Sequence, residues 1–345
     1  MDNINHLKKI INPLLEWYER CKRDLPWRHN PTPYRVWISE IMLQQTRVDP
    51  VIPYYLRFMD ALPDVNALAD ASTDHLMKLW EGLGYYSRAR NLQKAAVIIK
   101  EQGHFPADFE GWLALPGIGE YTAGAICSIA LGLPTPAVDG NVLRVLSRVL
   151  GSRKDIAHPS TKKEFTAALK SIYPKQETSS FTQGLMELGA LICLPNGQPK
   201  CLDCPLKEFC VAYLDGLTEE IPLKSPKKGR KIEERTVFIL KCNDKIALQK
   251  RPSKGLLAGL WEFPNILGKM TAEQAKEAFN GFSVTPLAPS NHIFTHIEWQ
   301  MIGYEIALQE EAEGYHWLPA EDILREKAIP SAYQTYINYL KQNCF

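Results

Sequence analysis

The chain has 345 residues, of which 45% are hydrophobic and 23% are charged, and its formal net charge is +1. This length allows two domains of ordinary size, each with a buried core. The composition excludes a disordered or low-complexity chain, and a net charge so close to zero decides nothing about a nucleic-acid partner.

Two further classes of protein are disfavoured by the sequence. No apolar run approaches the roughly 18 residues that a membrane span needs, and residues 1–11 lack the layout of a signal peptide. We therefore expect a soluble, cytoplasmic protein without a membrane partner. Eight cysteines in such a chain, four of them clustered, indicate metal chemistry more than a disulfide framework.

Residues 3 to about 215 are expected to be mostly helical. Apolar residues recur at helical spacing over Leu7–Trp17 and again over Val36–Val48. Ser72 is a residue type that caps helix N-termini, and a further helix is expected over about Ser87–Gln102.

A glycine turn within Leu115–Gly124 joins two more helical segments. Gly117 and Gly119 have no Cβ, so a phosphate can approach their backbone closely. Their N–H groups lie at the start of the following helix, where the helix dipole also favours an anion. The turn predicts a contact with nucleic-acid backbone that is independent of base sequence, although an ordinary helix-turn-helix corner also explains these residues.

The segment Val138-Asp-Gly-Asn141 follows Gly119 at a distance of about twenty residues. Asp139 is suited to cap the helix expected over Asn141–Leu150, and taken alone this is a structural role. The order of glycine turn, aspartate and cysteine group along the chain favours a catalytic role instead.

Four cysteines, Cys193, Cys201, Cys204 and Cys210, have the spacing C-x7-C-x2-C-x5-C. Thiolates this close together suit either Zn²⁺ or a [4Fe–4S] cluster. Zinc sites more often use two CxxC pairs, so the single CxxC favours the iron–sulfur cluster, while zinc and unrelated core cysteines remain alternatives. Such a cluster can stabilise a loop with little core of its own, and two lysines in this loop suit a phosphate backbone.

The composition changes over residues 221–233, where prolines and basic residues indicate an exposed linker. Beyond it we expect strands over 236–240, 245–249, 299–306 and 315–318, with helices over 273–279 and 332–340. The expected fold is therefore an all-α domain over 1–220, with a cysteine loop at 193–210, followed by a smaller α+β domain over 234–345.

With these motifs the sequence resembles the helix-hairpin-helix DNA glycosylase superfamily, and within it the MutY-type family that excises adenine, from about residue 10 to the C-terminus. The other motifs that carry the resemblance are Leu25–Arg28, Ser39–Arg47, Trp80–Arg88, Val138–Asn141 and Glu187–Ala190. It implies a monomeric enzyme with a [4Fe–4S] cluster that removes adenine mispaired with 8-oxoguanine or guanine in duplex DNA. One departure is the first cysteine gap, which has seven residues here and six in the family.

The resemblance implies two working carboxylates. An N-glycosidic bond breaks through an oxocarbenium-like state, so the two-carboxylate logic of glycosidases applies. Glu40, whose apolar neighbours would raise its pKa, would protonate N7 of adenine. Asp139 would stabilise the cation at C1′ or attack it, and Tyr121 and Asn141 would orient the two acids. Lyase relatives such as endonuclease III carry a lysine nucleophile where this chain has Tyr121, so we expect a monofunctional glycosylase.

The resemblance also implies residues that receive the target base after it leaves the duplex. The pocket residues would be Leu25, Trp27, Arg28 and Gln183, and the residues that wedge into the stack beside 8-oxoguanine would be Gln45 and Tyr85.

The C-terminal domain resembles the Nudix fold of the MutT phosphohydrolases. The Nudix box is missing, because only Glu273 and Glu277 follow Trp261–Pro264, too few carboxylates for the Mg²⁺ site. We therefore expect recognition of 8-oxoguanine and no hydrolysis, with the tripeptide Phe294-Thr295-His296 matching the reading loop of the family.

Three other functions fit parts of this pattern: an endonuclease III-like lyase for oxidised pyrimidines, a non-catalytic DNA-binding or iron–sulfur sensor protein, and a hydrolytic Nudix enzyme. Tyr121 and the second domain argue against the first. The intact Glu40 and Asp139 argue against the second, and the missing Nudix box against the third.

Overall fold

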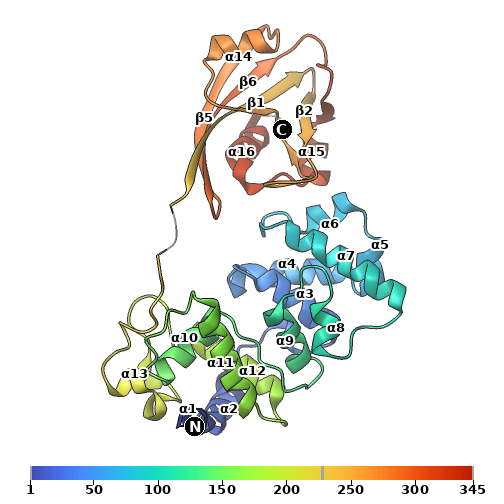
Figure 1. The fold of residues 1–345 in the computed structure, drawn as a ribbon. Coiled ribbons are helices and arrows are strands. Elements are labelled where there is room, and N and C mark those ends of the chain that lie inside the picture. The colour runs from blue at the N-terminus through green and yellow to red at the C-terminus, as the bar shows by residue number, and fades with distance from the viewer. Residues whose placement is uncertain (1, 227–228, 344–345) are drawn as a thin grey trace. The chain divides into compact units, whose positions relative to one another are not determined.

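A computed structural model describes residues 2–226 and 229–343 of the chain. These residues form two compact units (Figure 1). One consists of the described part of Met1–Ala69 together with Asn91–Pro226, and the other of Asp70–Arg90 together with the described part of Lys227–Phe345. The predicted order of a helical domain and a smaller α+β domain is confirmed.

Helices make up the chain before the linker. They are α1 (Asp2–Lys8), α2 (Ile11–Cys21), η1 (Pro26–Arg28), α3 (Pro33–Leu43), α4 (Val48–Ala61), α5 (Val65–Asp70), α6 (Thr73–Leu79), α7 (Ser87–Gln102), α8 (Phe109–Leu113), α9 (Glu120–Ile129), α10 (Gly140–Val149), α11 (Pro159–Ile172), α12 (Thr178–Leu191), η2 (Cys201–Asp203), η3 (Lys207–Phe209) and α13 (Val211–Leu214).

The apolar pattern over Val36–Val48 predicts helix, and the structure divides it into two helices. α3 ends at Leu43 and α4 begins at Val48, because Gln45 between them has a φ of 60°. A left-handed residue of this kind interrupts a right-handed helix. The expected cap at Ser72 is confirmed: its side chain caps α6, accepting from the backbone N of His75 at 3.2 Å.

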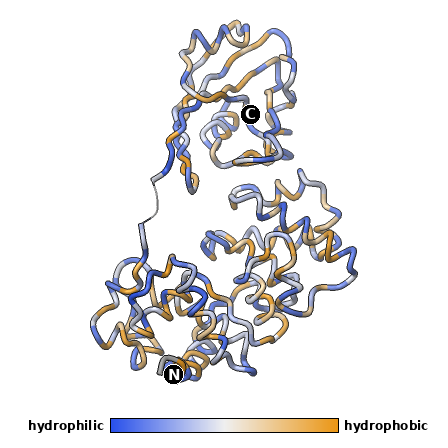
Figure 2. The backbone as a smooth tube through the Cα atoms, in the orientation of Figure 1, coloured by the Kyte–Doolittle hydropathy of each residue, from blue (hydrophilic) through white to orange (hydrophobic). Residues whose placement is uncertain are grey.

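The core of the first unit lies among α2, α10, α11 and α12. Leu14 on α2, Val145 on α10, Phe165 on α11 and Leu188 on α12 are all fully or almost fully buried in one cluster. Apolar residues alternate with polar ones along these helices (Figure 2), as expected where one face of a helix packs on the core and the other meets water. This packing fixes the N-terminus of α10 relative to α12.

The second unit is built around a mixed sheet. Its strands are β1 (Lys231–Cys242), β2 (Lys245–Lys250), β3 (Trp261–Glu262), β4 (Asn265–Leu267), β5 (Ser283–Ile293), β6 (Ile297–Ala307) and β7 (His316–Pro319). The main path runs β3-β2-β1-β6-β5, while β4 pairs with β1 and β7 with β2. β1 and β6 are parallel, with Lys231 opposite Ile297, and β5 and β6 are antiparallel.

Both faces of β1 are covered, which explains its uninterrupted apolar run. Val237 and Ile239 point into a cluster with α15 (Ala320–Glu326) and α16 (Gln334–Asn343), which follows η4 (Ser331–Tyr333). Phe238 and Leu240 point to the opposite face, in a cluster with α14 (Ala272–Ala278). Alternate residues of a strand face opposite sides, and Figure 1 shows α14 on one side of the sheet and α16 on the other.

The domain boundaries expected at 221–233 stay a prediction, and residues 227–228 of that segment lie outside the described residues. The structure adds that residues 70–90 belong to the same compact unit as the sheet. Lys78 Nζ donates to the carbonyl of Leu324 at 2.7 Å, and Lys250 forms an ion pair with Asp74 at 3.2 Å. Contacts between such distant positions leave no trace in local sequence patterns.

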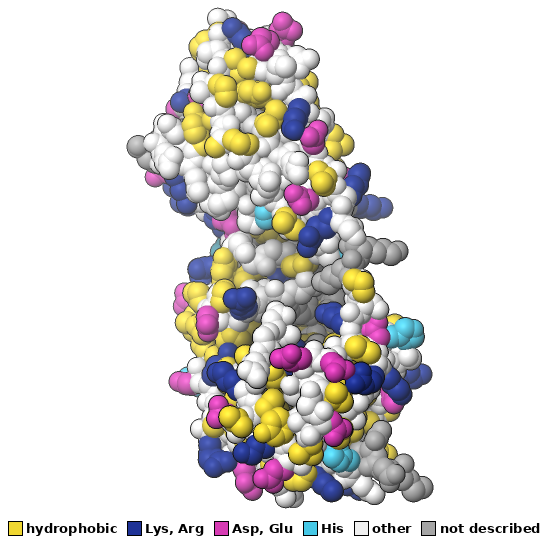
Figure 3. Space-filling view, turned by 90° about the vertical axis from the view of Figure 1, so that its left-hand side faces the viewer, with side chains coloured by type: hydrophobic (Ala, Val, Ile, Leu, Met, Phe, Trp, Pro, Cys, Tyr) yellow, Lys and Arg dark blue, Asp and Glu magenta, His cyan; other side chains and the backbone are white. Residues whose placement is uncertain are grey.

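None of the described helices is both long enough and apolar enough to cross a bilayer. On the face drawn in Figure 3, basic and acidic side chains are interspersed, which agrees with the net charge of +1.

Candidate active site

A cavity of about 720 Å³ lies in the first unit. Its lining combines side chains from η1, α3, α9, the start of α10 and α12 with residues that precede α4. The sequence-predicted site residues that line it are Leu25, Trp27, Arg28, Glu40, Gln45, Tyr121, Asp139, Asn141 and Gln183. Segments more than 150 residues apart thus supply one site.

Glu40 lies on α3, whose first turn is fixed by Thr32, which accepts from the backbone N of Arg35 at 3.3 Å. The side chain of Glu40 is 6% exposed, and Tyr121 on α9 donates its hydroxyl to Oε2 at 2.6 Å. Burial raises the pKa of Glu40 to about 7; the bond from Tyr121 and the charge of Arg28 oppose this rise, and the charge of Asp139 adds to it. A carboxyl group with this pKa still holds its proton in part at neutral pH.

Asp139 caps α10 and lines the same cavity. Its Oδ1 accepts from the backbone N of Val142 at 2.8 Å, and its Oδ2 accepts from Nδ2 of Asn141 at 2.9 Å. Burial raises the pKa of Asp139, while these hydrogen bonds favour its ionised form. The capping role and a role in the cavity therefore coincide, because the carboxylate uses one oxygen for the helix end and the other for Asn141.

Of two carboxyl groups in one cavity, one can donate a proton while the other supplies a negative charge. Burial raises the pKa of both groups, that of Glu40 to about 7, whereas Asp139 receives two N–H donors that favour its ionised form. Perturbed titratable groups that share one cavity are typical of acid–base catalysis.

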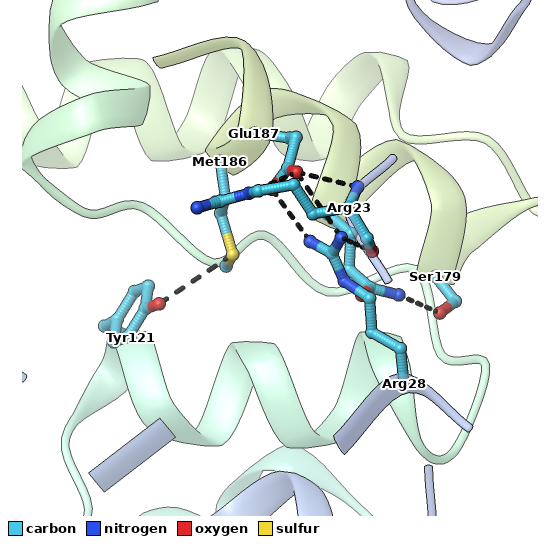
Figure 4. A network of polar contacts seen from close by, with 7 residues as sticks. Arg23, Arg28, Tyr121, Ser179, Met186 and Glu187 are labelled. Atoms are coloured by element: carbon cyan, nitrogen blue, oxygen red, sulfur yellow. Dashed lines mark hydrogen bonds and ion pairs between the residues drawn. The ribbon is translucent and has the colours of Figure 1, made fainter. Parts of the chain in front are cut away.

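Arg23 and Glu187 also line the cavity, and the sequence did not single them out as site residues. Figure 4 shows the Glu187 carboxylate held by Arg23 and Arg28, at 2.7 Å from Nε of Arg23 and 2.9 Å from Nη2 of Arg28. Arg23 and Glu187 are 164 positions apart, so local patterns give no signal for the pair. The only available signal was Glu187 itself, an acid in the otherwise mostly apolar motif Glu187–Ala190.

Arg144, buried on α10, connects the cavity to the cysteine loop. Its Nη2 donates to Oδ1 of Asn141 and to the carbonyl of Gly189, both at 2.8 Å. Its Nε donates to the carbonyl of Cys193 at 2.7 Å. A chain of hydrogen bonds therefore runs from Asp139 through Asn141 and Arg144 to Cys193, the first cysteine of the loop.

The four cysteines of the loop surround a second, small cavity. All four thiols are free, and Cys193, Cys201, Cys204 and Cys210 line this cavity together with Arg148 and Lys207. Arg148 Nη1 donates to Sγ of Cys193 at 3.2 Å. Among the described residues, no three His, Cys, Asp or Glu side chains are grouped so that they could hold a metal ion. Four thiols line one space, which is the number of donors that the [4Fe–4S] cluster expected from the sequence would need.

Gly117 and Gly119 form the turn between α8 and α9, outside the lining of the large cavity. Gly117 has a φ of +77°, and a Cβ there would lie 2.5 Å from Cβ of Asn91, so glycine is required. Gly119 caps α9, and a Cβ on it would meet nothing within 4 Å. The backbone at Gly119 is thus open to an approaching group.

The tripeptide Phe294-Thr295-His296 forms the turn between β5 and β6 in the second unit. The Phe294 ring packs edge-on against Trp299, with centroids 4.8 Å apart, and the two residues after it are exposed. In the same unit, the hydroxyl of Tyr85 lies 3.1 Å from Oγ1 of Thr295. The structure therefore brings Tyr85 and Thr295 together, although 210 positions separate them.

Gly189 on α12 sets how closely α10 approaches the cavity. A Cβ at this position would lie 2.6 Å from Cβ and 3.2 Å from Cα of Asn141. We expect Gly189→Ala to lower the free energy of unfolding by about 1–3 kcal/mol, because the backbone of α10 must move. Denaturant unfolding measures this loss.

Gly184→Ala on the same helix is the matched control for this prediction. Its Cβ would come no nearer than 3.3 Å to the side chains of Leu14 and Tyr18, which can shift. The control should lose less stability, because its neighbours are side chains that can shift, while the gain in helix propensity from glycine to alanine is common to both variants. Equal losses in the two variants would contradict the close approach at Gly189.

The comparisons with known proteins agree with this geometry. Residues 38–175 match the HhH-GPD superfamily of base excision DNA repair proteins, and residues 236–339 match the NUDIX domain family. The chain is 41% identical over 269 residues to an adenine DNA glycosylase of Buchnera aphidicola subsp. Acyrthosiphon pisum, covering 77% of each protein. It is 34% identical over 379 residues to adenine DNA glycosylase of Mus musculus, covering 90% of this chain and 73% of the relative.

Solved structures of DNA glycosylases have the same fold. A thermostable thymine-DNA glycosylase matches with a TM-score of 0.56 and 28% identity, covering 61% of this chain and 98% of that one. Endonuclease III from a non-covalent complex with DNA matches with a TM-score of 0.53 and 24% identity, covering 62% and 98% of the two chains. The predicted family resemblance is confirmed: the chain belongs to the adenine DNA glycosylases of the helix-hairpin-helix base excision repair superfamily.

Proposed function

We propose that this enzyme hydrolyses the N-glycosidic bond of adenine that lies opposite 8-oxoguanine or guanine in duplex DNA. The observation that carries the proposal is the cavity shared by Glu40 and Asp139, in which one carboxyl group has a pKa of about 7 and the other accepts two N–H donors. This arrangement supplies both a proton for a leaving base and a negative charge for a sugar cation.

In the proposed mechanism, Glu40 donates its proton to N7 of adenine, and the protonated base then leaves with the bonding electrons. The Tyr121 hydroxyl fixes Oε2 of Glu40, so the rotamer of the acid is set before the base arrives. Asp139 stabilises the cation that develops at C1′ or attacks it, and Asn141 holds one of its oxygens. Water completes the hydrolysis.

The adenine must leave the helix before this chemistry, and the cavity offers a place for it. A volume of about 720 Å³ is ample for an extruded nucleotide. We assign Leu25 and Trp27 to its apolar wall, because both are buried and line the cavity. Arg28 and Gln183 supply the polar contacts to the edge of the base, joined to each other by a bond of 2.9 Å.

The enzyme is proposed to be a glycosylase without lyase activity. A lyase needs an amine that attacks C1′ and forms a Schiff base. Tyr121 occupies the candidate position, and no lysine is found among the described residues that line the cavity. The abasic product should therefore stay intact until alkali cleaves it.

Recognition of 8-oxoguanine is proposed for Thr295, with Phe294 and His296 beside it and Gln45 and Tyr85 as wedges. Gln45 and Tyr85 are both exposed and have φ angles of 60° and 46°. Left-handed backbone in non-glycine residues costs about 1–3 kcal/mol and is concentrated at functional sites. The contact between Tyr85 and Thr295 supports a recognition site in which the wedging ring of Tyr85 lies beside the hydroxyl of Thr295. This domain is proposed to bind and not to hydrolyse its ligand.

Thr295→Ala is expected to lower the preference for 8-oxoguanine over guanine opposite adenine by about 2–12-fold, the equivalent of one hydrogen bond. Competition between the two duplexes measures the preference. Tyr85→Phe removes the partner hydroxyl and keeps the ring, so the two variants together form a double-mutant cycle. An unchanged preference in Thr295→Ala would remove this residue from the recognition site.

The four cysteines are proposed to bind a [4Fe–4S] cluster, supported by their convergence on one cavity. The cluster would hold the loop of η2 and η3 in one conformation, so that the lysines of this loop could bind DNA phosphates. The open backbone at Gly119 would bind a phosphate as well. We further propose that the protein works as a monomer on DNA inside the cell.

A single-turnover assay on a duplex with one A·8-oxoguanine pair tests the proposed function. Release of free adenine, with strand cleavage only after alkali, is the expected result. Cleavage without alkali would indicate a lyase. Binding without release would indicate a non-catalytic protein, and either result would overturn the proposal.

A further inference from the structure

Glu187 is a buried anion that the proposed mechanism does not use. It is 1% exposed, and three N–H groups of Arg23 reach it: Nε and the backbone N reach Oε1 at 2.7 and 3.1 Å, and Nη2 reaches Oε2 at 2.9 Å. Arg28 adds Nη2 at 2.9 Å from Oε2. One carboxylate thus fixes two guanidinium groups, as Figure 4 shows.

The side chains of Glu187, Arg23 and Arg28 together carry one net positive charge. Burial alone would raise the pKa of Glu187, but the hydrogen bonds and charges of Arg23 and Arg28 outweigh it and hold the pKa at about 2. Glu187 is therefore ionised at neutral pH, and two cations face one anion. A cluster of this kind, largely shielded from water, acts on nearby groups with little screening.

Arg28 is the member of the cluster that acts on the catalytic acid. The titratable and charged groups that face Glu40 are Tyr121 on α9, Asp139 at the start of α10 and Arg28 on η1. Arg23, Arg47 and Asp49 also line the cavity. Arg28 Nη1 in addition donates to the carbonyl of Arg23 at 2.9 Å, so its guanidinium has a fixed place.

Arg28 also fixes the orientation of the Gln183 side-chain amide. Its Nε donates to Oε1 of Gln183 at 2.9 Å, and Nε2 of Gln183 donates to Oγ of Ser179 at 3.0 Å. The amide oxygen is thereby occupied, which leaves the second N–H of the amide for a ligand. Ring nitrogens of a purine base accept such a donor.

We propose that Glu187 is a positioning residue that, with Arg23 and Arg28, holds one net positive charge beside the catalytic acid Glu40 and so sets the pH range in which adenine is released. This inference rests on the proposed function of Glu40. The Glu187 carboxylate, which is paired with Arg28, partly offsets the charge of Arg28 at Glu40. The positive charge of Arg23 in turn offsets part of the negative charge of Glu187.

The sign of the effect follows from these charges. Positive charge near Glu40 favours its ionised form and lowers its pKa, and negative charge raises it. Glu187→Gln leaves two guanidinium groups without a counter-charge, so Glu40 should lose its proton at lower pH. Arg23→Met leaves Arg28 fully paired with Glu187, so Glu40 should keep its proton to higher pH. The two variants should therefore shift the pH profile in opposite directions.

The test measures the single-turnover rate of adenine release against pH, with enzyme in saturating excess over an A·8-oxoguanine duplex. We expect the alkaline limb of the profile to move down by about half a pH unit or more in Glu187→Gln, and up by a similar amount in Arg23→Met. Glu187→Asp, which keeps the charge, is the control and should titrate like the wild type even if its rate is lower.

Each outcome decides between positioning by charge and simple structural support. Profiles that coincide with the wild type, or limbs that move the same way in both variants, overturn the inference. If Glu187→Gln does not fold, the upward shift of Arg23→Met decides alone. A wild-type enzyme that releases no adenine would defeat the proposed function instead, so the two failures are distinguishable.

Discussion

Glutamine in place of Glu40 is expected to slow adenine release by about 10²–10⁴-fold, the range of one general acid, while binding of the mismatched duplex persists. Glutamine has the same shape and still accepts the hydroxyl of Tyr121, but it has no proton to give at N7. The wild-type rate should itself hold below the pKa of about 7 and fall above it, because only the protonated acid is active. This pH dependence should be absent from the residual rate of the variant.

Single-turnover kinetics and a binding titration on the same duplex separate the two effects. Glu262→Gln is the matched control, since Glu262 is 4% exposed against 6% for Glu40 and lies in the other unit. It reports the cost of losing a buried carboxylate that does not line the cavity. Turnover of Glu40→Gln at the wild-type rate would show that another group protonates the base.

Asp139→Asn is the second change with a large expected effect, a loss of about 10²–10³-fold in the rate of adenine release. Asparagine caps helices as well as aspartate does, so α10 should keep its N-terminus. The variant lacks the negative charge that would stabilise the cation at C1′. It also lacks the charge that raises the pKa of Glu40, so the acid should be less protonated at neutral pH.

Asp108→Asn provides the control for capping, because Asp108 caps α8 by accepting from the backbone N of Gly111 at 2.8 Å and does not line the cavity. Both variants should unfold at nearly the wild-type temperature. Only Asp139→Asn should lose activity, measured as before by single turnover. A loss of stability that accounts for the whole loss of rate would reduce Asp139 to a helix cap.

The helical half of the fold follows well from the sequence, and the sheet less so. α7 spans Ser87–Gln102, the range expected from the sequence. β5, by contrast, had no prediction, because Pro286 and Pro289 argue against a strand and its residues are mostly exposed or half-buried. An edge strand tolerates proline where no ladder bond is needed, and the register shifts between Leu287 and Ser290. Such tolerance depends on the neighbours of a strand and not on its own pattern.

The site shows the same division between local and distant information. Glu40, Asp139 and the cysteines lie in short motifs, and each could be singled out from its neighbours. Arg23 and Arg144 could not, and Glu187 gave no signal beyond its place in the motif Glu187–Ala190, because the contacts of these residues are with partners 45 to 164 positions away. In the structure Arg23 and Glu187 line the cavity, and Arg144 holds Asn141, which also lines it.

The backbone at Gln45 and Tyr85 has a consequence for engineering of the enzyme. Both residues have positive φ angles, where glycine would relieve strain of about 1 kcal/mol or more. A laboratory selection for heat resistance alone would therefore favour glycine at both positions. The selected variants would be more stable but would lack the two side chains that are proposed to wedge into the base stack, so stability and recognition of damage would oppose each other at these two residues.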